Sequence, residues 1–321
     1  MSAVASGGFW VFVAVVAGIY TIFALGLQLQ FGFTGLLNFG QVAFMAVGAY
    51  TMAILVVKEG WSMWIAAPLA VLAAAVAGLV LGLPALRLRA DYFAIVTIAF
   101  SEIVRYVATN EDSLTGGSQG TIALGKVGQA AQYNGQWERF QGGVQGWLHV
   151  SSKDTAMLVL VWIAAVLLLT ATWLAVRTPW GRVLKSIRED EDAAASLGKN
   201  VFAYKLQALA LGAALAGVAG CFYAWQFSFF SPDDFQPLVT FFAWMIVILG
   251  GLGRVWSVPV GALVFGFLFA GTRFFDFAPF SYLDSADRAY VRLIVIGLVI
   301  IGLVLLRPQG LLGRREEMVL E

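Results

Sequence analysis

Seven long apolar stretches constrain the fold of this chain more than any other feature. A hydrocarbon core about 30 Å thick needs roughly 20 apolar residues in a helix. Stretches of about that length fall at 9–29, 40–57, 62–83, 92–109, 155–176, 203–227 and 290–306. Of the 321 residues, 60% are hydrophobic and only 12% are charged, about half the charged share of soluble domains. We therefore predict an all-α, polytopic integral membrane protein, with 1–321 as one transmembrane domain.

A further apolar stretch, 238–271, is interrupted by the sequence Gly250-Gly251-Leu252-Gly253-Arg254. Each arm is shorter than a full span. The arms are either two short spans or a re-entrant hairpin, whose irregular backbone is tolerated only where protein or water satisfies it. With this glycine-broken pair, the predicted count is about eight to nine transmembrane helices.

Several function classes are excluded by what the sequence lacks. The net charge of +1, without a basic run or an aromatic-basic stripe, argues against nucleic acid as a partner. Cys221 is the single cysteine and His149 the single histidine, so neither an intrachain disulfide nor a His/Cys metal site is expected. One histidine and no paired carboxylates within a span leave no recognisable catalytic set. We predict a protein that is not an enzyme and has no cofactor.

One stretch resembles a nucleotide-binding loop and is rejected. Gly120-Thr121-Ile122-Ala123-Leu124-Gly125-Lys126 matches the first seven positions of a P-loop, but the eighth is Val127. The hydroxyl that would hold Mg²⁺ is therefore missing. We predict that this chain does not bind ATP.

Orientation follows from Lys and Arg in short loops, because cytoplasmic loops carry an excess of both. Cations concentrate at 177–205, at Arg87 and Arg89, and in the tail at Arg307, Arg314 and Arg315. We predict that these regions and the C-terminus are cytoplasmic, and that 110–154 and 272–289 are external. No Lys or Arg precedes the first stretch, so it should be a retained span and not a cleaved signal. The side of the N-terminus is left open.

The long polar segment 110–154 is rich in Gly, Gln and Asn. We expect an ordered external cap with short interfacial helices, and a floppy loop is the alternative. Within it, Thr115, Gly116 and Gly117 belong to a glycine-rich turn. Successive glycine amides can form an anion-cradling nest for a substrate carboxylate at the outer mouth. The same residues would also suit a tight turn.

Two uncharged, glycine-rich breaks are candidates for a substrate path. The first, 31–41, supplies Thr34, Gly35, Asn38, Gly40 and Gln41, and the second supplies Gly250, Gly251 and Gly253. A pair of glycine-interrupted segments, one in each half of a chain, points to a transport path. Close helix packing through small residues is the alternative.

Glu102 is also assigned to the path, because it lies about 15 Å into the 92–109 stretch at 1.5 Å per residue. A carboxylate at that depth is costly unless it is paired or faces water. Arg105 lies three residues on, so a purely structural ion pair is the alternative.

The loop 177–202 favours docking of a soluble partner. Pro179 suits a helix start, and Val183, Leu184 and Ile187 form an apolar face beside basic residues. Four acidic residues follow, which a plain membrane-surface helix would not need. The candidate docking residues are Trp180, Gly181, Arg182, Lys185, Arg188, Glu189, Asp190, Glu191, Asp192, Ala193, Ala194 and Gly198.

At this loop the sequence resembles a known family. Asp192-Ala193-Ala194, three residues and then Gly198 are similar to the Glu-Ala-Ala-x-x-x-Gly coupling loop of ABC importer permeases. The blocks 34–41, 86–97, 114–118, 179–192 and 250–253 resemble, in order, the LivM-type branched-chain amino-acid permeases. Three positions depart from the family pattern: Ala90 replaces a usual Gly, Lys199 precedes Asn200, and Arg254 replaces a small residue.

The resemblance implies a permease subunit in a bacterial-type inner membrane that translocates branched-chain amino acids. It implies a second related permease as heterodimer partner, two ABC ATPases that contact the 178–198 loop and hydrolyse ATP, and an external substrate-binding protein. Urea and short-amide permeases share these motifs and remain an alternative substrate class. A stand-alone, ion-driven secondary transporter is the alternative from a different class.

Overall fold

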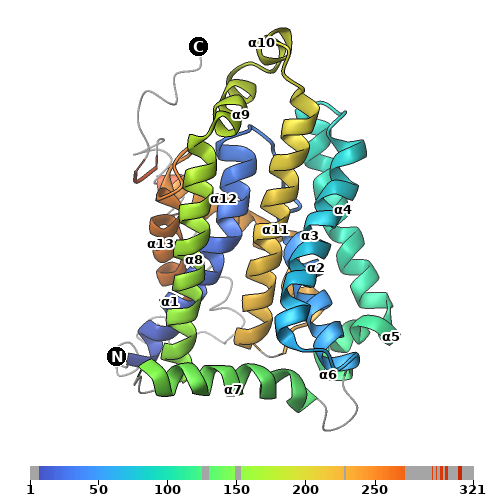
Figure 1. Cartoon of the computed structure of the whole chain (residues 1–321), viewed down its shortest axis with the longest axis vertical. Helices are drawn as coiled ribbons and strands as arrows, with labels where there is room; N and C mark the ends of the chain where they lie inside the picture. Colours follow the sequence, from blue (N-terminus) through green and yellow to red (C-terminus); the bar gives the residue numbers. More distant parts are fainter. Residues whose placement is uncertain are drawn as a thin grey trace.

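The computed structural model describes residues 7–124, 130–148, 153–227, 229–271, scattered positions between 291 and 302, and 310–312. Every regular element in this part of the chain is helical, as Figure 1 shows. The predicted loop 272–289, most of the predicted span 290–306, His149, and the cations Arg307, Arg314 and Arg315 lie outside the described residues.

Six helices of the described part are long and apolar enough to cross a membrane. They coincide, within a few residues, with six of the seven apolar stretches, which confirms a polytopic helical membrane protein. They are α1 (Gly7–Leu27) with the π-helical turn η1 (Gln28–Gly32), α2 (Gln41–Ala53) with the π-helical turn η2 (Ile54–Lys58), α3 (Met63–Ala85), α4 (Ala90–Asn110), α8 (Lys153–Arg177) and α11 (Val201–Phe227).

The glycine-broken stretch forms two shorter apolar helices, α12 (Pro237–Gly250) and α13 (Ser257–Gly271). At 14 residues, α12 is about 21 Å long, which is shorter than the hydrocarbon core is thick. A short 3-10 turn, η4 (Pro232–Phe235), precedes it. Near the far end of α13, Phe267 stacks on Trp10 of α1 with ring centroids 5.9 Å apart.

Short helices close the two ends of the bundle (Figure 1). At one end, α9 (Pro179–Glu189) and α10 (Glu191–Ser196) connect α8 to α11. At the other end, α7 (Ala130–Leu148) lies across the bundle, next to α5 (Asp112–Thr115), η3 (Gly117–Gln119) and α6 (Thr121–Leu124). On α7, Trp137 is buried and stacks on Trp225 of α11 at 4.3 Å. The polar segment 110–154 is therefore largely helical and packed against the bundle where it is described. Its external location stays a prediction.

Small residues allow the central helices to approach one another closely. Ala66, Ala70 and Ala74 recur every fourth position on α3 and are fully buried. On α11, a Cβ added at Gly217 would come within 2.6 Å of the Ala74 side chain. Such contacts matter in a bilayer, where apolar lipid supplies no hydrophobic force between helices and packing must hold them together.

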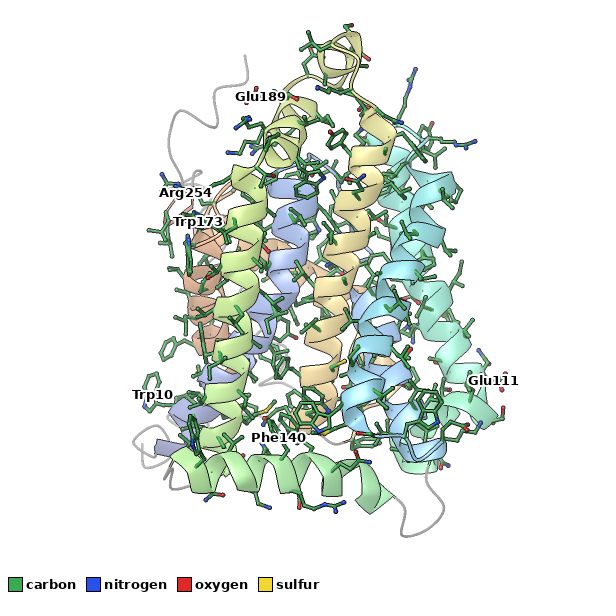
Figure 2. All side chains as sticks on the ribbon, viewed as in Figure 1. Trp10, Glu111, Phe140, Trp173, Glu189 and Arg254 are labelled. Carbon is green, nitrogen blue, oxygen red and sulfur yellow. The ribbon has the colours of Figure 1, made fainter. Side chains whose placement is uncertain are left out.

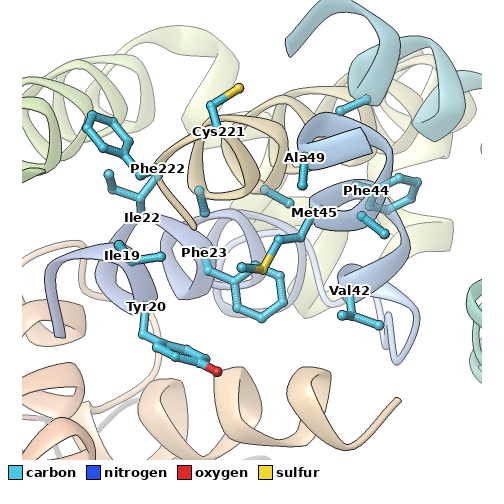
Figure 3. Packing of buried hydrophobic residues seen from close by; sticks show 14 of the residues in the cluster. Ile19, Tyr20, Ile22, Phe23, Val42, Phe44, Met45, Ala49, Cys221 and Phe222 are labelled. Atoms are coloured by element: carbon cyan, nitrogen blue, oxygen red, sulfur yellow. The ribbon is translucent and has the colours of Figure 1, made fainter. Parts of the chain in front are cut away.

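Large apolar side chains fill the space between α1, α2 and α11 (Figure 3). Phe23 and Met45 interdigitate there with at most 1% of their surface exposed, and Cys221 lies at the same layer. The outer helices are less enclosed: only 22% of the most apolar window of α4 and 28% of that of α8 are buried. Their outward faces are therefore available to lipid or to other subunits.

Candidate functional site

The chain unwinds between α1 and α2, at residues 33–40, where no residue is charged. The first helix ends in the π-helical turn η1, a feature often found at functional sites. Gly35 has a φ of 77°, a conformation that residues with a Cβ rarely adopt, and its amide donates to the Phe31 carbonyl at 3.0 Å. The irregular backbone expected from the glycines is present.

Asn38 lies at the centre of a buried hydrogen-bond network. Its Nδ2 donates to Gln30 Oε1 at 2.8 Å and to Gln41 Oε1 at 3.0 Å. Its Oδ1 accepts from the Gly40 amide at 2.8 Å. Asn38, Gln30 and Gln41 are fully buried, and a buried polar group without a partner costs about 1–3 kcal/mol. We refer to Gln30, Asn38, Gly40 and Gln41 as the Asn38 network.

The Asn38 network is bonded to α11. Gln30 Nε2 donates to the Leu209 carbonyl at 3.2 Å, and Gln41 Nε2 donates to the Gly212 carbonyl at 2.9 Å. Gly212 has no room for a side chain, because an added Cβ would overlap the Gln30 amide. Both glutamines are thereby fixed in orientation: their amide nitrogens face α11 and their oxygens face Asn38.

The same segment is bonded to α4 and α12. The Phe39 amide donates to Thr97 Oγ1 of α4 at 3.0 Å, and Trp244 Nε1 of α12 donates to the Asn38 carbonyl at 3.0 Å. Gly40 packs directly on α4, since a Cβ there would overlap the Thr97 carbonyl oxygen. Residues 30–41 therefore join α4, α11 and α12, which are far apart in the sequence.

The second glycine-rich break, 250–261, is in contact with the first. Gln28 in η1 donates through Nε2 to the carbonyls of Gly251 and Arg254, at 3.3 and 3.0 Å. Gly251 and Gly253 have φ values of 117° and 75°, which favour glycine. The Oε1 of Gln28 is buried and has no hydrogen-bond partner among the described residues. Both breaks assigned to the path thus meet at one glutamine.

A piece of the C-terminal tail closes over this second break. The Leu311 amide donates to the Leu249 carbonyl at 2.8 Å, and the Leu312 amide donates to the Gly250 carbonyl at 3.0 Å. These bonds satisfy carbonyls that would otherwise be left open at the end of α12. Gly250 itself packs against α13, where a Cβ would overlap the Ser257 carbonyl oxygen.

Glu102 is not brought into contact with either break. Arg105 Nη2 lies 2.7 Å from Glu102 Oε2, and Arg105 Nη1 lies 3.2 Å from Asp233 Oδ1 in η4. The Glu102 side chain is 29% exposed. These contacts match the structural ion pair between Glu102 and Arg105 that their i, i+3 spacing indicated. A role of Glu102 in the substrate path stays a prediction.

We expect Glu102→Gln to have a small effect. Exposed and half-exposed ion pairs contribute about 0–1 kcal/mol, and Arg105 keeps Asp233 as a partner. The melting temperature of the detergent-solubilised chain should fall by no more than a few degrees, with transport reduced at most about twofold. A loss of transport without a change in melting temperature would instead assign Glu102 to the path.

The Thr115–Gly117 turn uses its own polar groups. Thr115 Oγ1 donates to the Ala108 and Glu111 carbonyls at 2.6 and 2.7 Å, and the Gly117 amide donates back to Thr115 Oγ1 at 3.3 Å. The Gly116 amide donates to the Asp112 carbonyl. These amides are already engaged, an arrangement that suits the tight turn better than an anion nest.

At the opposite end, α9 and α10 form a compact helix pair fixed to α8 and α11. Leu184 and Ile187 are buried against the bundle, and Gly181 is held so close that a Cβ would overlap the Val176 carbonyl oxygen. Trp180 Nε1 donates to Gln207 Oε1 at 2.8 Å. Residues 179–189, for which an apolar face beside basic residues was predicted, therefore form a helix. One face of this helix is packed against the bundle, and Arg182, Lys185 and Glu189 are exposed.

The shorter helix α10 presents acidic and apolar groups to solvent. The Asp190 carboxylate caps it by accepting from the Ala193 amide at 2.9 Å, and Ala194 packs inward. The helix ends before Gly198, whose φ is 76°. Glu191, Asp192 and Ala193 are exposed. Glu191 also forms an ion pair with Lys205. Leu197 at the tip is 78% exposed.

Arg188 connects this helix pair to the unwound segment. Its Nη1 donates to the Gly32 carbonyl at 2.6 Å, and Gly35 lies within 4 Å of the Arg188 backbone and side chain, measured from the position of an added Cβ. Lys185 lies over the Phe33 ring at 5.7 Å. A displacement of α9 would therefore be transmitted directly to residues 32–35.

A pocket of about 480 Å³ opens beside this connection. Its walls are residues 34–37, the turn 86–90 between α3 and α4, and α9. Arg87, Arg89 and Arg188 line it together with the Glu191–Lys205 pair. The structure thus brings Thr34 and Gly35 to the α9 end of the bundle, whereas Asn38, Gly40 and Gln41 lie deeper.

Comparison with known proteins identifies the family of this chain. Residues 9–304 match the family model described as branched-chain amino acid transport system, permease component. The chain belongs to this family. The permease is 34% identical to the high-affinity branched-chain amino acid transport system permease LivM of Salmonella typhimurium, over 94% of this chain and 69% of the relative. LivM of Escherichia coli K12 matches equally, with 34% identity over 94% and 69%.

A second group of relatives aligns with this chain over nearly the whole length of both proteins. LivH of Escherichia coli K12, a permease of the same kind of transport system, is 26% identical over 92% of each chain. No solved structure shows a significant match to the permease.

Sequence reasoning missed several residues that hold the site together: Gln28, Gln30, Thr97, Gly212 and Trp244. The two glutamines carried a signal, because polar side chains in an apolar stretch are costly unless they are partnered. Thr97 carried none, since a helical threonine commonly bonds its own backbone. Among the described residues of the permease, no group of three or more His, Cys, Asp or Glu could hold a metal ion.

Proposed function

We propose that this permease is the membrane-spanning subunit of an ABC importer that translocates branched-chain amino acids. The observation that carries the proposal is its 34% identity, over 94% of the chain, to permeases of high-affinity branched-chain amino acid transport systems. The exposed helix pair α9–α10 supports it, because a compact, charged pair fixed to the bundle end suits docking of a soluble subunit.

We propose that the α9–α10 end is cytoplasmic and the α7 end external, in a bacterial-type inner membrane. The distribution of cations supports this orientation, since cytoplasmic loops are enriched in Lys and Arg. The α9–α10 end carries Arg87, Arg89, Arg177, Arg182, Lys185, Arg188, Lys199, Lys205 and Arg254. The C-terminus is then cytoplasmic, consistent with the contact of 310–312 at that end.

The span count of eight to nine is kept as part of this proposal. The six long helices account for six spans. The turn between α12 and α13 lies at the α9 end, beside Arg182 and Lys185, and α13 extends from there to Trp10. This arrangement favours two short spans over a hairpin that turns within the membrane, and the stretch 290–306 would add one more.

We assign the substrate path to the region where the two glycine-rich breaks meet. Because Asn38 bonds Gln30 and Gln41, and both glutamines bond α11, the path is closed here, and opening must exchange these bonds for others. The pocket beside Arg188 is its cytoplasmic mouth. The assigned residues are Thr34, Gly35, Asn38, Gly40, Gln41, Gly250, Gly251 and Gly253. Glu102, Thr115, Gly116 and Gly117 are kept as sequence-based candidates toward the external end, although their bonds favour structural roles.

The partners follow from the same proposal. Two ATPase subunits hydrolyse ATP and dock on α9–α10, an external binding protein delivers substrate at the α7 end, and a second, related permease completes the path. The weakly enclosed face of α4, with 22% of its apolar window buried, offers room for that second permease.

Reconstitution tests the proposal. Proteoliposomes containing this chain, its sister permease, both ATPases and the binding protein should take up leucine only with ATP inside. Isoleucine and valine should compete and urea should not. Uptake of urea in place of leucine would overturn the substrate class, and ion-driven uptake by this chain alone would overturn the importer mechanism.

A further inference from the structure

A second pocket lies at the α9 end, beside the second glycine-rich break and apart from the pocket proposed as the mouth of the path. It has a volume of about 500 Å³ and lies between the end of α8, the start of α9 and the turn that joins α12 to α13. Figure 2 shows Trp173 and Arg254 together at the side of the bundle, below Glu189. We call it the flank pocket and define it by Trp173, Arg177, Arg182, Lys185, Arg254 and Trp256.

The flank pocket is strongly cationic. Four of its residues are Arg or Lys, and no Asp or Glu of the described chain lines it. Within those same described residues, none of the four forms an ion pair. The pocket beside Arg188 differs, because it contains Glu191 paired with Lys205. Unpaired positive charge at this density attracts an anion.

Two of these cations are held in position by neutral groups. The Arg177 guanidinium lies 3.9 Å from the centre of the Trp173 ring, and Arg254 Nη1 donates to the Leu312 carbonyl at 2.8 Å. Both contacts orient the guanidinium without cancelling its charge. The remaining donors of each fork stay available, and Arg is the residue best suited to hold a phosphate through two parallel hydrogen bonds.

The pocket also offers an apolar surface that continues onto α8. Trp256 is 46% exposed, and Val166, two turns before Trp173 on the same face of α8, is 47% exposed. Tryptophans are enriched at the boundary between membrane and water. A ligand for this site therefore has an anionic head and an apolar body that extends toward the bilayer.

We propose that the flank pocket binds an anionic phospholipid of the cytoplasmic leaflet. The phosphate lies among Arg177, Arg182, Lys185 and Arg254, and the acyl chains follow α8. Basic pockets between spans on the cytoplasmic side bind such headgroups. The proposal depends on the orientation proposed above but not on the substrate. It also explains the position of Arg254, where the family pattern has a small residue.

Native mass spectrometry of the detergent-solubilised full chain tests the site. The probes are phosphatidylglycerol and phosphatidylcholine with identical acyl chains. The parent chain should retain one phosphatidylglycerol with a preference of about tenfold or more, because the choline cation of phosphatidylcholine is repelled by the four Arg and Lys side chains of the pocket. Arg177→Gln and Arg254→Gln should each lower that retention about tenfold, whereas Arg89→Gln, which removes the same charge at the other pocket, should not.

Two checks keep the result interpretable. Arg177→Gln breaks no hydrogen bond of the described structure and serves if Arg254→Gln disturbs its turn, and thermal unfolding in neutral detergent reports the fold of each variant. Equal retention of the two lipids, unchanged retention in both variants, or an equal loss in Arg89→Gln would overturn the proposal. It is also overturned if the variants keep the lipid but no longer co-purify with ATPase subunits, because the pocket would then be a protein interface.

Discussion

Replacing Asn38 by aspartate should strongly destabilise the permease. The variant keeps the acceptor for the Gly40 amide but loses the donor that serves Gln30 and Gln41. Rotating the glutamine amides cannot repair this, because their oxygens would then face the Leu209 and Gly212 carbonyls. Two buried groups without partners cost about 2–6 kcal/mol together.

Cys221 reports this loss directly. It is the single cysteine of the chain and is buried, so a thiol-reactive fluorophore labels it only when the bundle opens. We expect the melting temperature of Asn38→Asp to fall by at least about 5 °C.

The matched control is Asn110→Asp, at the exposed end of α4. There the side chain bonds only the Tyr106 carbonyl of its own helix, so its melting temperature should change by a degree or two at most. If the two variants melt alike, Asn38 is not the centre of a network on which the fold depends.

The spans were predictable because hydrophobic length is a local property. Each of α1, α2, α3, α4, α8 and α11 follows from its own 20 or so residues, whatever the rest of the chain does. The contact between Glu102 and Arg105 was predictable for the same reason, since three residues on a helix determine it. The amphipathic character of α9 was equally local.

The partners of the unwound segment were not predictable, because they come from distant parts of the chain. Asn38 bonds Trp244, which is 206 residues away, and Gln28 bonds the Arg254 carbonyl, 226 residues away. The glycines 35, 40, 250 and 251 indicated irregular backbone but not that the two breaks meet. Likewise, Arg254 stood out in the sequence only as a departure from a pattern; its place beside Arg177 and Trp173 needed the fold.

Replacing Arg188 by alanine should uncouple ATP hydrolysis from transport in the reconstituted importer. Arg188 is the residue through which α9, the proposed docking helix, bonds the unwound segment, at the Gly32 carbonyl. A hydrogen bond from a charged donor is worth about 1.5–3 kcal/mol, so the coupling between the two sites should fall roughly 10- to 100-fold. Leucine transported per ATP hydrolysed should drop accordingly, while the ATPases still co-purify.

Two further variants separate coupling from docking. Arg182 is exposed and makes no side-chain bond within the described chain. Arg182→Ala should therefore weaken binding of the ATPases. The complexes that still assemble should keep the parent ratio of leucine transported to ATP hydrolysed. Arg139→Ala removes a cation of α7, at the opposite end, whose side chain bonds a carbonyl of its own helix, and should change neither quantity. If Arg188→Ala behaves like Arg182→Ala, the Arg188 bond only anchors α9 and does not couple it to residues 32–35. The coupling must then use another contact, and the contact of Lys185 with Phe33 is the next candidate.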